Sequence, residues 1–484
     1  MKLKDLLRNT EILAGNADME ADISGVSYDS RLTQPGDLFV AVKGFESDGH
    51  RFIPNALKAG AAVILCEDVP EGEAAYVRVA DSRRALAFVS AEFFRRPAEE
   101  MKIIGVTGTS GKTTTTHLIK HILETKKQAK VGMVGTNGNM IGDELLHTEH
   151  TTPESYELQK LFRRMADEGC SYAVMEVSSH SLTLDRVAGI RFAAAAFTNL
   201  SQDHLDFHKT MEDYAAAKKK IFSMCDAACI NLDDAWAPSM MDGISCRLIT
   251  TSANASYASI YAKDVCLSAD GVSFTAVSSG REVPVHLAIP GMFSVHNALT
   301  AISVCVSLGI PLEDCAEALA CAKGVKGRVE AVPVDGDYTV LIDYSHKPDA
   351  LENVLKTLRP VTKGRLMVLF GCGGDRDRTK RPIMGRVAAE NADVVIVTSD
   401  NPRTEEPEAI ISEIVEGLRG CTTPYEVICD RIQAIHWAID NARAGDVILL
   451  AGKGHEDYQI IGHEKHHMDE REIVADYLKE KSSL

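Results

Sequence analysis

GVTGTSGKTTTT, residues Gly105 to Thr116, is the stretch that decides the fold. The apolar run Ile103–Val106 predicts a buried strand, and a helical pattern begins at about Thr113. A strand, a glycine-rich turn and a helix in this order are typical of a phosphate-binding loop, because backbone N–H groups and the helix N-terminus then face an anion. Gly108 and Gly111 let the backbone approach the phosphates closely.

Two side chains of this loop have predicted roles. Lys112 is placed to meet the outer phosphates of a nucleotide, and the hydroxyl of Thr113 is placed to hold Mg²⁺. The match to the general pattern is incomplete, because Val106 occupies its first glycine position and Gly105 lies one residue earlier. A glycine-rich turn that merely precedes a helix is the alternative, and the GKT sequence at the helix start argues against it.

Strand-like runs alternate with helical patterns along the 484 residues, which indicates an α/β fold with mostly parallel, doubly wound sheets. The length corresponds to about three domains. We predict boundaries at 1–98, 99–330 and 331–484, with Pro97–Lys102 as a linker. The expected strands are Leu38–Val42, Ile103–Val106, Ala173–Val177, Ala193–Thr198, Ala228–Asn231, Thr339–Ile342, Leu366–Phe370, Val394–Thr398 and Val447–Leu450, and the expected helices include Met211–Met224, Glu408–Leu418 and Arg431–Asn441.

The composition limits the classes of function. Hydrophobic residues make up 45% of the chain, so disorder is disfavoured. The net charge of -17 favours solubility and repels nucleic acid and anionic membranes. The charged N-terminus does not fit a signal peptide, and no apolar run approaches the roughly 20 residues of a membrane helix. The twelve cysteines form no CxxC pair, which favours reduced thiols. We expect a cytoplasmic protein with no membrane insertion and no nucleic-acid partner.

Two motifs of the middle block suit metal-assisted chemistry. MEVSSHS, residues 175–181, offers Glu176, and TNLSQDHLDFH, residues 198–208, offers His204. Each motif follows a predicted strand, and ligands bind at the carboxyl ends of strands in open α/β sheets. Taken alone, each side chain is more often a polar group satisfied within the fold. Their position beside a phosphate loop favours metal binding.

The predicted helix Met211–Met224 directs a lysine inward. Tyr214, Lys218 and Phe222 share one face of it, whereas Lys219 points elsewhere. Burial lowers the pKa of a lysine, and a neutral amine can react with CO₂ to give a carbamate, an anionic oxygen ligand suited to Mg²⁺. From this pattern alone, a Lys218 that extends to solvent is the favoured interpretation.

Ten motifs occur in one order along the chain: GVTGTSGKTTTT, MEVSSHS, TNLSQDHLDFH, YAAAKKKIF, VHNALTA, GRVE, DYSHKPDAL, FGCGGDRD, SDNPRTEEP and GKGHE. With DSR at Asp29–Arg31, they resemble the Mur ligases, most closely the members that add meso-diaminopimelate to UDP-N-acetylmuramoyl-L-alanyl-D-glutamate. The resemblance extends from Asp29 to Glu456 and implies an ATP-dependent amide-bond ligase of peptidoglycan precursor biosynthesis. It also implies a smaller UDP-substrate-binding α/β domain, a central ATP-binding domain and a Rossmann-like amino-acid-binding domain, in a protein that we expect to be a monomer.

The resemblance assigns roles at the nucleotide. It implies that Lys218 is N6-carboxylysine and that Thr113, Glu176, His204 and this carbamate hold Mg²⁺. The implied catalytic residues are Lys112, Lys218, His204 and Glu176. The implied ATP contacts are Gly108, Thr109, Ser110, Gly111, Lys112, Thr113, Thr114, Asn297, Arg328 and Asp343.

The other two substrates also have implied contacts. Those of the UDP-linked dipeptide are Ser30, Thr151, Thr152, Ser178 and Arg186. Those of diaminopimelate are Arg376, Asp400, Asn401, Pro402, Arg403, Gly452 and Glu456. The implied reaction begins with attack of the dipeptide γ-carboxylate on ATP, which gives an acyl phosphate. The amine of diaminopimelate then attacks this intermediate and displaces phosphate.

Arg403 carries the predicted specificity. Diaminopimelate has a second carboxylate that L-lysine lacks, and a guanidinium can hold a carboxylate with two hydrogen bonds. Family members that add lysine generally lack an arginine at this position. An exposed arginine before the following acids is the alternative structural role of Arg403.

Three other functions are alternatives for this chain. A lysine-adding ligase is disfavoured by DNPR, and a folylpolyglutamate synthetase by DSR and the long N-terminal block. A non-catalytic nucleotide-binding protein is expected to lack some of the catalytic residues, and none is lost here. Four positions depart from the family pattern, and we assign His150 no role; they are Ser110, His150, Ser345 and Lys347.

Overall fold

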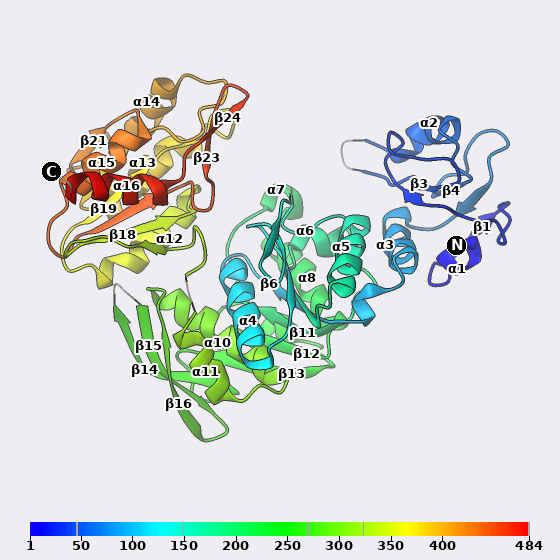
Figure 1. Cartoon of the computed structure of the whole chain (residues 1–484), viewed down its shortest axis with the longest axis horizontal. Helices are drawn as coiled ribbons and strands as arrows, with labels where there is room; N and C mark the ends of the chain where they lie inside the picture. The colour runs from blue at the N-terminus through cyan, green and yellow to red at the C-terminus, as the bar shows by residue number, and fades with distance from the viewer. Residues whose placement is uncertain (45–46, 149, 269–270, 323, 483–484) are drawn as a thin grey trace. The chain divides into compact units, whose positions relative to one another are not determined.

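The strands and helices of the chain alternate in the computed structural model, which describes residues 1–44, 47–148, 150–268, 271–322 and 324–482. The elements, labelled in Figure 1, divide into two compact units. The first unit contains residues 1–261 and 299–315, and the second contains residues 262–298 and 316–484. The predicted α/β fold class is confirmed.

The start of the chain forms a five-stranded sheet in the order β1-β5-β4-β3-β2, in which only β1 is antiparallel. Leu38, Val40 and Leu65 of this sheet and Leu86 of α3 share one buried core. The strand predicted at Leu38–Val42 ends at Val40, which is the last residue paired with β4 and lies one residue beyond the last pair with β2. The elements are α1 (Leu3–Leu6), β1 (Ala14–Gly15), β2 (Val26–Ser27), β3 (Leu38–Val40), α2 (Ile53–Lys58), β4 (Val63–Cys66), β5 (Tyr76–Arg78) and α3 (Ser82–Phe93), with 3-10 helices at Gly49–Phe52 and Pro97–Glu99.

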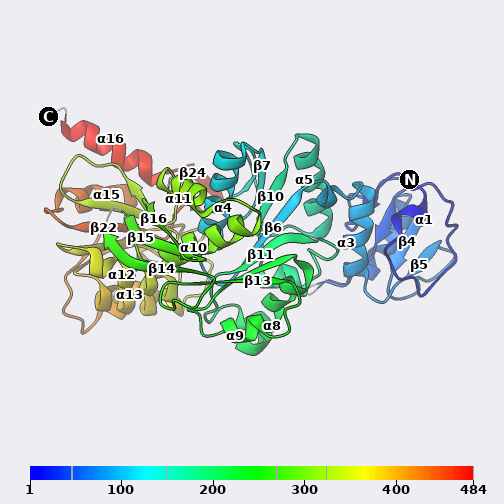
Figure 2. The same ribbon diagram turned by 90° about the horizontal axis from the view of Figure 1, so that it is seen from below.

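A larger sheet follows in the first unit, in the order β13-β12-β11-β6-β10-β7-β8-β9. The strands from β13 to β7 are parallel, and β6, β10 and β11 lie side by side in Figure 2. Glu176 pairs with Val106, and Phe197 pairs with Thr107, so the carboxyl ends of these three strands meet at one edge. The strands are β6 (Lys102–Thr107), β7 (Val131–Val134), β8 (Asn139–Ile141), β9 (Glu144–Leu146), β10 (Tyr172–Glu176), β11 (Phe192–Phe197), β12 (Ala227–Asn231) and β13 (Arg247–Ser252).

Apolar side chains at helical spacing fix the helices on this sheet. On α4, Leu118, Ile122 and Leu123 are buried, and on α5 Leu158 and Phe162 are buried. With Ile119, which is also buried on α4, these side chains follow the helical period and so form one face. The helices are α4 (Lys112–Lys127), α5 (Ser155–Asp167), α6 (Ser179–Thr183), α7 (Leu205–His208), α8 (Met211–Lys219), α9 (Ala237–Met241), α10 (Met292–Ser307) and α11 (Leu312–Ala320).

The helix predicted at Met211–Met224 is shorter than expected. It is α-helical only to Lys219 and continues as the 3-10 helix Lys220–Met224. A 3-10 turn is common at the C-terminus of an α-helix. The predicted buried face is nevertheless present, because Tyr214 and Lys218 are each 1% exposed.

The second unit contains a six-stranded sheet in the order β17-β18-β22-β19-β20-β21, in which only β17 is antiparallel. Helices α12, α13 and α14 pack on one face, and α15 and α16 pack on the other (Figure 1). The sheet elements are β17 (Glu330–Val332), β18 (Thr339–Asp343), β19 (Leu366–Phe370), β20 (Val394–Val397), β21 (Tyr425–Val427) and β22 (Val447–Ala451). The helices are α12 (Pro348–Leu358), α13 (Lys380–Asn391), α14 (Pro407–Leu418), α15 (Arg431–Asp440) and α16 (Glu470–Ser482), with a 3-10 helix at Arg359–Val361.

Two antiparallel pairs complete the strands. Strand β14 (Ile260–Ser268) begins beside β13, and β15 (Gly271–Ser278) pairs with β16 (Arg281–Leu287). Strands β23 (Tyr458–Ile461) and β24 (Glu464–His467) form a separate hairpin. None of the helices in the described part of the chain is long and apolar enough to cross a membrane.

A buried ion pair joins α15 to α16. Arg431 Nε donates to Glu470 Oε1 at 2.9 Å, and Arg431 Nη2 donates to the carbonyl of Ala451 at 2.9 Å. The side chains of Arg431 and Glu470 are 0% and 1% exposed. The guanidinium therefore bonds one oxygen of a buried carboxylate and the carbonyl at the end of a central strand.

Replacement of Arg431 by methionine is expected to lower the free energy of unfolding by about 3–5 kcal/mol, because it leaves the Glu470 carboxylate buried without its partner. Urea unfolding measures the loss, and hydrogen exchange of peptides from α16 locates it. The double variant Arg431→Met with Glu470→Leu is expected to regain most of the stability. A single variant as stable as the wild-type protein contradicts this role.

Candidate functional site

The phosphate loop follows β6, where a glycine is required by a close approach. A Cβ atom at Gly108 would lie 1.9 Å from Thr198 Oγ1, at the end of β11. Gly111 has a φ of 81° and precedes the first residue of α4. These contacts place the loop between two strand ends and direct the N-terminus of α4 toward it.

Two lysines converge on the carbonyl oxygen of Gly108. Lys112 Nζ donates to it at 3.0 Å and to the Thr109 carbonyl at 2.8 Å. Lys218 Nζ donates to the same Gly108 oxygen at 2.8 Å and lies 4.5 Å from the ring centre of Tyr214. Lys218 thus points inward, and the interpretation favoured from the helix pattern alone, a Lys218 that extends to solvent, is wrong.

The environment of Lys218 disfavours its charged form. Burial lowers the pKa of Lys218 well below its usual value, and the charge of Lys112 adds to this effect. A lysine with a lowered pKa has a larger neutral fraction, and only the neutral amine can react with CO₂.

Glu176 is buried at the end of β10 and connects several loops. Its Oε1 accepts from Thr113 Oγ1 at 3.0 Å and from the backbone N–H of Thr136 at 2.9 Å. Thr136 Oγ1 also lies 3.2 Å from Glu176 Oε2 and 3.0 Å from Thr151 Oγ1. The predicted residues Thr113, Glu176 and Thr151 therefore lie in one hydrogen-bonded series.

His204 lies at the start of α7 with a φ of 53°. Its ring centre is 4.8 Å from that of His180 and 6.2 Å from that of Tyr214, the residue in contact with Lys218. No group of three or more His, Cys, Asp or Glu side chains suited to a metal is found among the described residues. Only two members of the predicted Mg²⁺ set, Glu176 and His204, are of these residue types. The other two predicted ligands are the Thr113 hydroxyl and a carbamate at Lys218.

The predicted contacts of the UDP-linked dipeptide extend the series away from Glu176. Thr152 Oγ1 donates to the carbonyl of Glu176 at 2.9 Å and lies 3.4 Å from Ser178 Oγ. Arg186 Nη1 donates to the Thr152 carbonyl at 2.9 Å, and its Nη2 lies 2.7 Å from Glu154. Four predicted substrate residues are thus brought together beside the phosphate loop.

A cavity of about 610 Å³ lies in the first unit and includes the fifth, Ser30. Glu154 lines this cavity and pairs with both Arg83 and Arg186. Sequence reasoning did not identify Arg83 or Glu154, because both derive their position from contacts distant in the sequence. The lining residues are Tyr28, Asp29, Ser30, Arg31, Val42, Gly44, Ser47, Gly49, Phe52, Asn55, Arg83, Leu86 and Glu154.

The remaining predicted ATP contacts lie in the second unit. Asp343 Oδ2, at the end of β18, accepts from the backbone N–H of Val329 at 2.9 Å. Burial raises the pKa of Asp343, although Arg328 opposes this shift. Arg328 lies 5.2 Å from the ring centre of Tyr344, and Asn297 is buried on α10. Contact of these residues with a nucleotide stays a prediction.

A second cavity, of about 570 Å³, lies at the carboxyl ends of β18, β19, β20 and β22. Six of the seven residues predicted to meet the incoming amino acid line it, and Pro402 is the exception. The lining residues are Tyr344, His346, Lys347, Pro348, Asp349, Gly373, Arg376, Asp377, Thr379, Lys380, Ile383, Asp400, Asn401, Arg403, Gly452 and Glu456.

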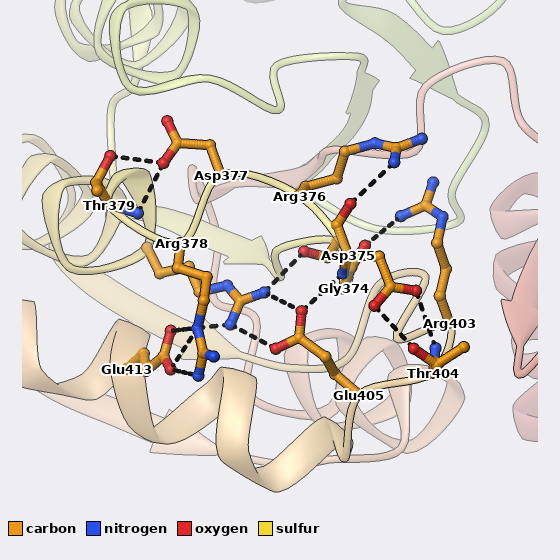
Figure 3. Close-up of polar contacts among 12 residues, drawn as sticks. Gly374, Asp375, Arg376, Asp377, Arg378, Thr379, Arg403, Thr404, Glu405 and Glu413 are labelled. Carbon is orange, nitrogen blue, oxygen red and sulfur yellow. Dashed lines mark hydrogen bonds and ion pairs between the residues drawn. The ribbon is translucent and has the colours of Figure 1, made fainter.

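The cavity is lined by both cationic and anionic side chains. Arg376 and Arg403 lie beside Gly373, where a Cβ atom would be 3.7 Å from Arg376 Cγ and 2.9 Å from Arg403 Nη1. Figure 3 shows both guanidinium groups on the same side of their loops. Asp400 and Glu456 supply carboxylates. Such a cavity suits an amino acid with both charges.

A buried lysine that the sequence did not reveal joins the acids. Lys453 is 0% exposed, and its Nζ lies 3.1 Å from Asn401 Oδ1, 3.1 Å from Glu456 Oε2 and 3.5 Å from Asp400 Oδ1. Its place in the GKGHE motif is the only sequence signal. The lysine neutralises part of the negative charge and fixes these three side chains.

Comparisons with known proteins agree along the chain. The Mur ligase family catalytic domain matches residues 22–107, the Mur ligase middle domain 106–305, and the Mur ligase glutamate ligase domain 327–454. The chain is 48% identical to UDP-N-acetylmuramoyl-L-alanyl-D-glutamate--2,6-diaminopimelate ligase of Caldanaerobacter subterraneus, over 99% of both chains. It is 45% identical to the enzyme of that name from Clostridium tetani, over 99% of this chain and 100% of the relative.

Solved structures extend the likeness. A structure of UDP-N-acetylmuramoyl-L-alanyl-D-glutamate--2,6-diaminopimelate ligase matches with a TM-score of 0.76 and 33% identity, over 100% of this chain and 99% of that chain. Folylpolyglutamate synthase of Mycobacterium tuberculosis shares the fold, with a TM-score of 0.61 and 17% identity, over 77% of this chain and 92% of that chain. Since the family models span the phosphate loop, the first cavity and all of the second cavity except Glu456, and relatives match from end to end, the chain belongs to the Mur ligase family.

Proposed function

We propose that the protein is the ATP-dependent ligase that joins meso-diaminopimelate to UDP-N-acetylmuramoyl-L-alanyl-D-glutamate in peptidoglycan precursor biosynthesis in the cytoplasm. The observation that carries the proposal is the cavity lined by Arg376 and Arg403 together with Asp400 and Glu456, in a chain 48% identical over its length to a ligase of this name. A monomer is proposed, with domains at 1–98, 99–330 and 331–484 for the UDP-linked dipeptide, ATP and the amino acid.

The phosphoryl step is assigned to the phosphate loop and its neighbours. Lys112 and the backbone at the start of α4 are placed to bind the outer phosphates of ATP. Thr113, Glu176, His204 and a carbamylated Lys218 would hold Mg²⁺, which stabilises the negative charge of the transferring phosphoryl group. The inward Lys218 and the contact of Thr113 with Glu176 support this set.

The two remaining substrates are assigned to the two cavities. Ser30, in the first cavity, and Thr151, Thr152, Ser178 and Arg186, beside the phosphate loop, are proposed to bind the UDP-linked dipeptide. In the second cavity, Arg376 and Arg403 are proposed to bind carboxylates of the amino acid, because a guanidinium matches a carboxylate in shape and charge. The acids there attract ammonium groups. The proposed contacts are Arg376, Asp400, Asn401, Pro402, Arg403, Gly452 and Glu456.

Product formation tests the function directly. The purified protein is incubated with ATP, Mg²⁺, the UDP-linked dipeptide and one amino acid at a time, and the amide product is detected by mass spectrometry. We expect product with meso-diaminopimelate and ATP consumption only when both other substrates are present. A greater yield with L-lysine, or ATP consumption without an amino acid, contradicts the proposal.

Replacement of Arg403 by alanine is expected to lower kcat/KM for meso-diaminopimelate by about 10- to 100-fold, the effect of losing about 1.5–3 kcal/mol of charged hydrogen bonding. Steady-state kinetics with meso-diaminopimelate and with L-lysine measure the effect. The value for L-lysine is expected to stay the same or rise, because lysine has no second carboxylate. Arg386→Ala, at an exposed position of α13, is the matched control. Equal losses with both amino acids contradict this role.

Replacement of Lys218 by alanine is expected to lower kcat by about 10²- to 10³-fold, the range for losing one electrostatic contact to a transition state. A short carboxylate such as formate is expected to restore part of the activity. Lys219→Ala is the control, since Lys219 pairs with Asp242 near the surface.

The carbamate itself is tested without activity. After incubation with ¹³C-bicarbonate, wild-type protein and Lys219→Ala are expected to show a carbamate carbon signal by ¹³C NMR, and Lys218→Ala is expected to lack it. Full activity of Lys218→Ala, or the same signal in all three proteins, removes the carbamate from the mechanism.

A further inference from the structure

The guanidinium of Arg381, on α13, is completely buried beneath the second cavity. Its Nη2 donates to Glu405 Oε1 at 2.8 Å and its Nη1 donates to Glu405 Oε2 at 3.0 Å, so the pair is bidentate. Nη1 also donates to Glu413 Oε2 at 2.8 Å, and Nη2 donates to the Gly373 carbonyl at 3.2 Å. Arg381 is 0% exposed and does not line the cavity. It therefore acts on the cavity only through other residues.

Glu405 connects Arg381 to a second loop. Its Oε1 accepts from the backbone N–H of Asp375 at 2.6 Å. The guanidinium of Arg381 lowers the pKa of Glu405 to about 2, so the carboxylate is ionised near neutral pH. A bidentate arginine–carboxylate pair fixes the orientation of both planar groups.

The two loops that carry Arg376 and Arg403 are joined along their length (Figure 3). Gly374 N donates to the Asn401 carbonyl at 2.9 Å, and Arg403 Nη1 donates to the Gly374 carbonyl at 2.8 Å. The backbone N–H and the hydroxyl of Thr404 donate to the Asp375 carboxylate at 3.2 and 2.8 Å. One loop therefore cannot move without the other.

Close approach and backbone strain confirm the tight fit of these loops. A Cβ atom at Gly374 would lie 1.8 Å from the Pro402 carbonyl oxygen, so only glycine fits there. Asp375 and Arg403 have φ values of 54° and 52°, in the left-handed region. Non-glycine residues persist in this region where the surrounding structure fixes them. Glu405, the partner of Arg381, accepts from the backbone N–H of Asp375, one of these two residues.

We propose that Arg381, through Glu405 and the Gly373 carbonyl, is a positioning residue that sets the placement of Arg376 and Arg403 and thereby the preference for an amino acid with a second carboxylate. The proposal rests on the proposed function of the second cavity. Arg381 does not touch the amino acid. It changes which amino acid is accepted, because Arg376 and Arg403, which it positions, bind the second carboxylate.

An ion pair at the opposite ends of the strands of the same sheet provides a matched control. Arg365 precedes β19, whereas the cavity lies beyond its other end, and Arg365 Nη2 donates to Asp446 at 2.6 Å. The Asp446 side chain is 2% exposed. Loss of Arg365 is therefore expected to destabilise the same unit without disturbing the loops that carry Arg376 and Arg403.

The test compares Arg381→Met, Glu405→Gln and Arg365→Met in the full-length protein. The measured quantity is the ratio of kcat/KM for meso-diaminopimelate to kcat/KM for L-lysine. We expect Arg381→Met to lower this ratio by about 10- to 100-fold, the effect of a misplacement of about 1 Å in a binding group. Glu405→Gln is expected to lower it less, because the amide keeps one oxygen acceptor. Arg365→Met is expected to lower Tm and leave the ratio unchanged.

A double variant separates positioning from general destabilisation. If Arg381 acts through Arg376 and Arg403, adding Arg381→Met to the double variant Arg376→Ala with Arg403→Ala is expected to leave the ratio of that double variant unchanged. A further loss on adding Arg381→Met overturns the proposal, as does a wild-type ratio in both Arg381→Met and Glu405→Gln. Should Arg381→Met fail to fold, Arg381→Lys replaces it, since lysine keeps the charge and loses the bidentate geometry.

The failure of this inference is distinct from that of the proposed function. A wild-type protein that makes no product with meso-diaminopimelate removes the function. A wild-type protein that prefers meso-diaminopimelate, with a lowered ratio in Arg403→Ala and an unchanged ratio in Arg381→Met and Glu405→Gln, removes only the positioning role.

Discussion

The carbonyl oxygen of Gly108 accepts hydrogen bonds from both Lys112 and Lys218, and the first unit is arranged around this shared contact. Two ammonium groups on one oxygen repel each other, and burial adds a desolvation cost for the charge of Lys218. A carbamate at Lys218 would replace this repulsion by attraction, because the side chain would then be anionic beside Lys112. The same change would add a second anionic oxygen ligand for Mg²⁺ to the carboxylate of Glu176 and the imidazole of His204.

The second unit solves a related problem of charge. The chain has a net charge of -17, yet its proposed amino-acid substrate carries two carboxylates. Arg376 and Arg403 supply local positive charge. Lys453 holds Asp400 and Glu456 in the lining of the cavity, where their carboxylates are available to the ammonium groups of the amino acid. Local placement of arginine therefore outweighs the sign of the whole surface, because exposed charges more than about 10 Å apart are largely screened at moderate salt.

Local patterns predicted central strands such as β6, β10, β19 and β22, the phosphate loop and the burial pattern around Lys218, because these depend on residues close in the sequence. The 3.6-residue period placed Tyr214 and Lys218 on one face, yet it could not decide whether the lysine extends to solvent; the Gly108 contact decides this, over 110 positions of sequence. Arg83, Glu154, Lys453 and Arg381 were not identified, since their roles arise from tertiary contacts. The change to a 3-10 helix at Lys220 was also missed, because both helix types can bury the same face.

The phosphate loop and the second cavity differ in which neighbouring residues limit substitutions. The phosphate loop is constrained by the strand end at Thr198, which leaves no room for a side chain at Gly108. The loops after β19 and β20 are constrained instead by each other and by Arg381 of α13, whose side-chain partners lie on α14 and on both loops. A substitution in these loops can therefore alter which amino acid is accepted while the sheet and the phosphate loop stay the same. The buried guanidinium makes such a change depend on several residues together, because Glu405, Gly373 and Arg403 share one hydrogen-bonded arrangement.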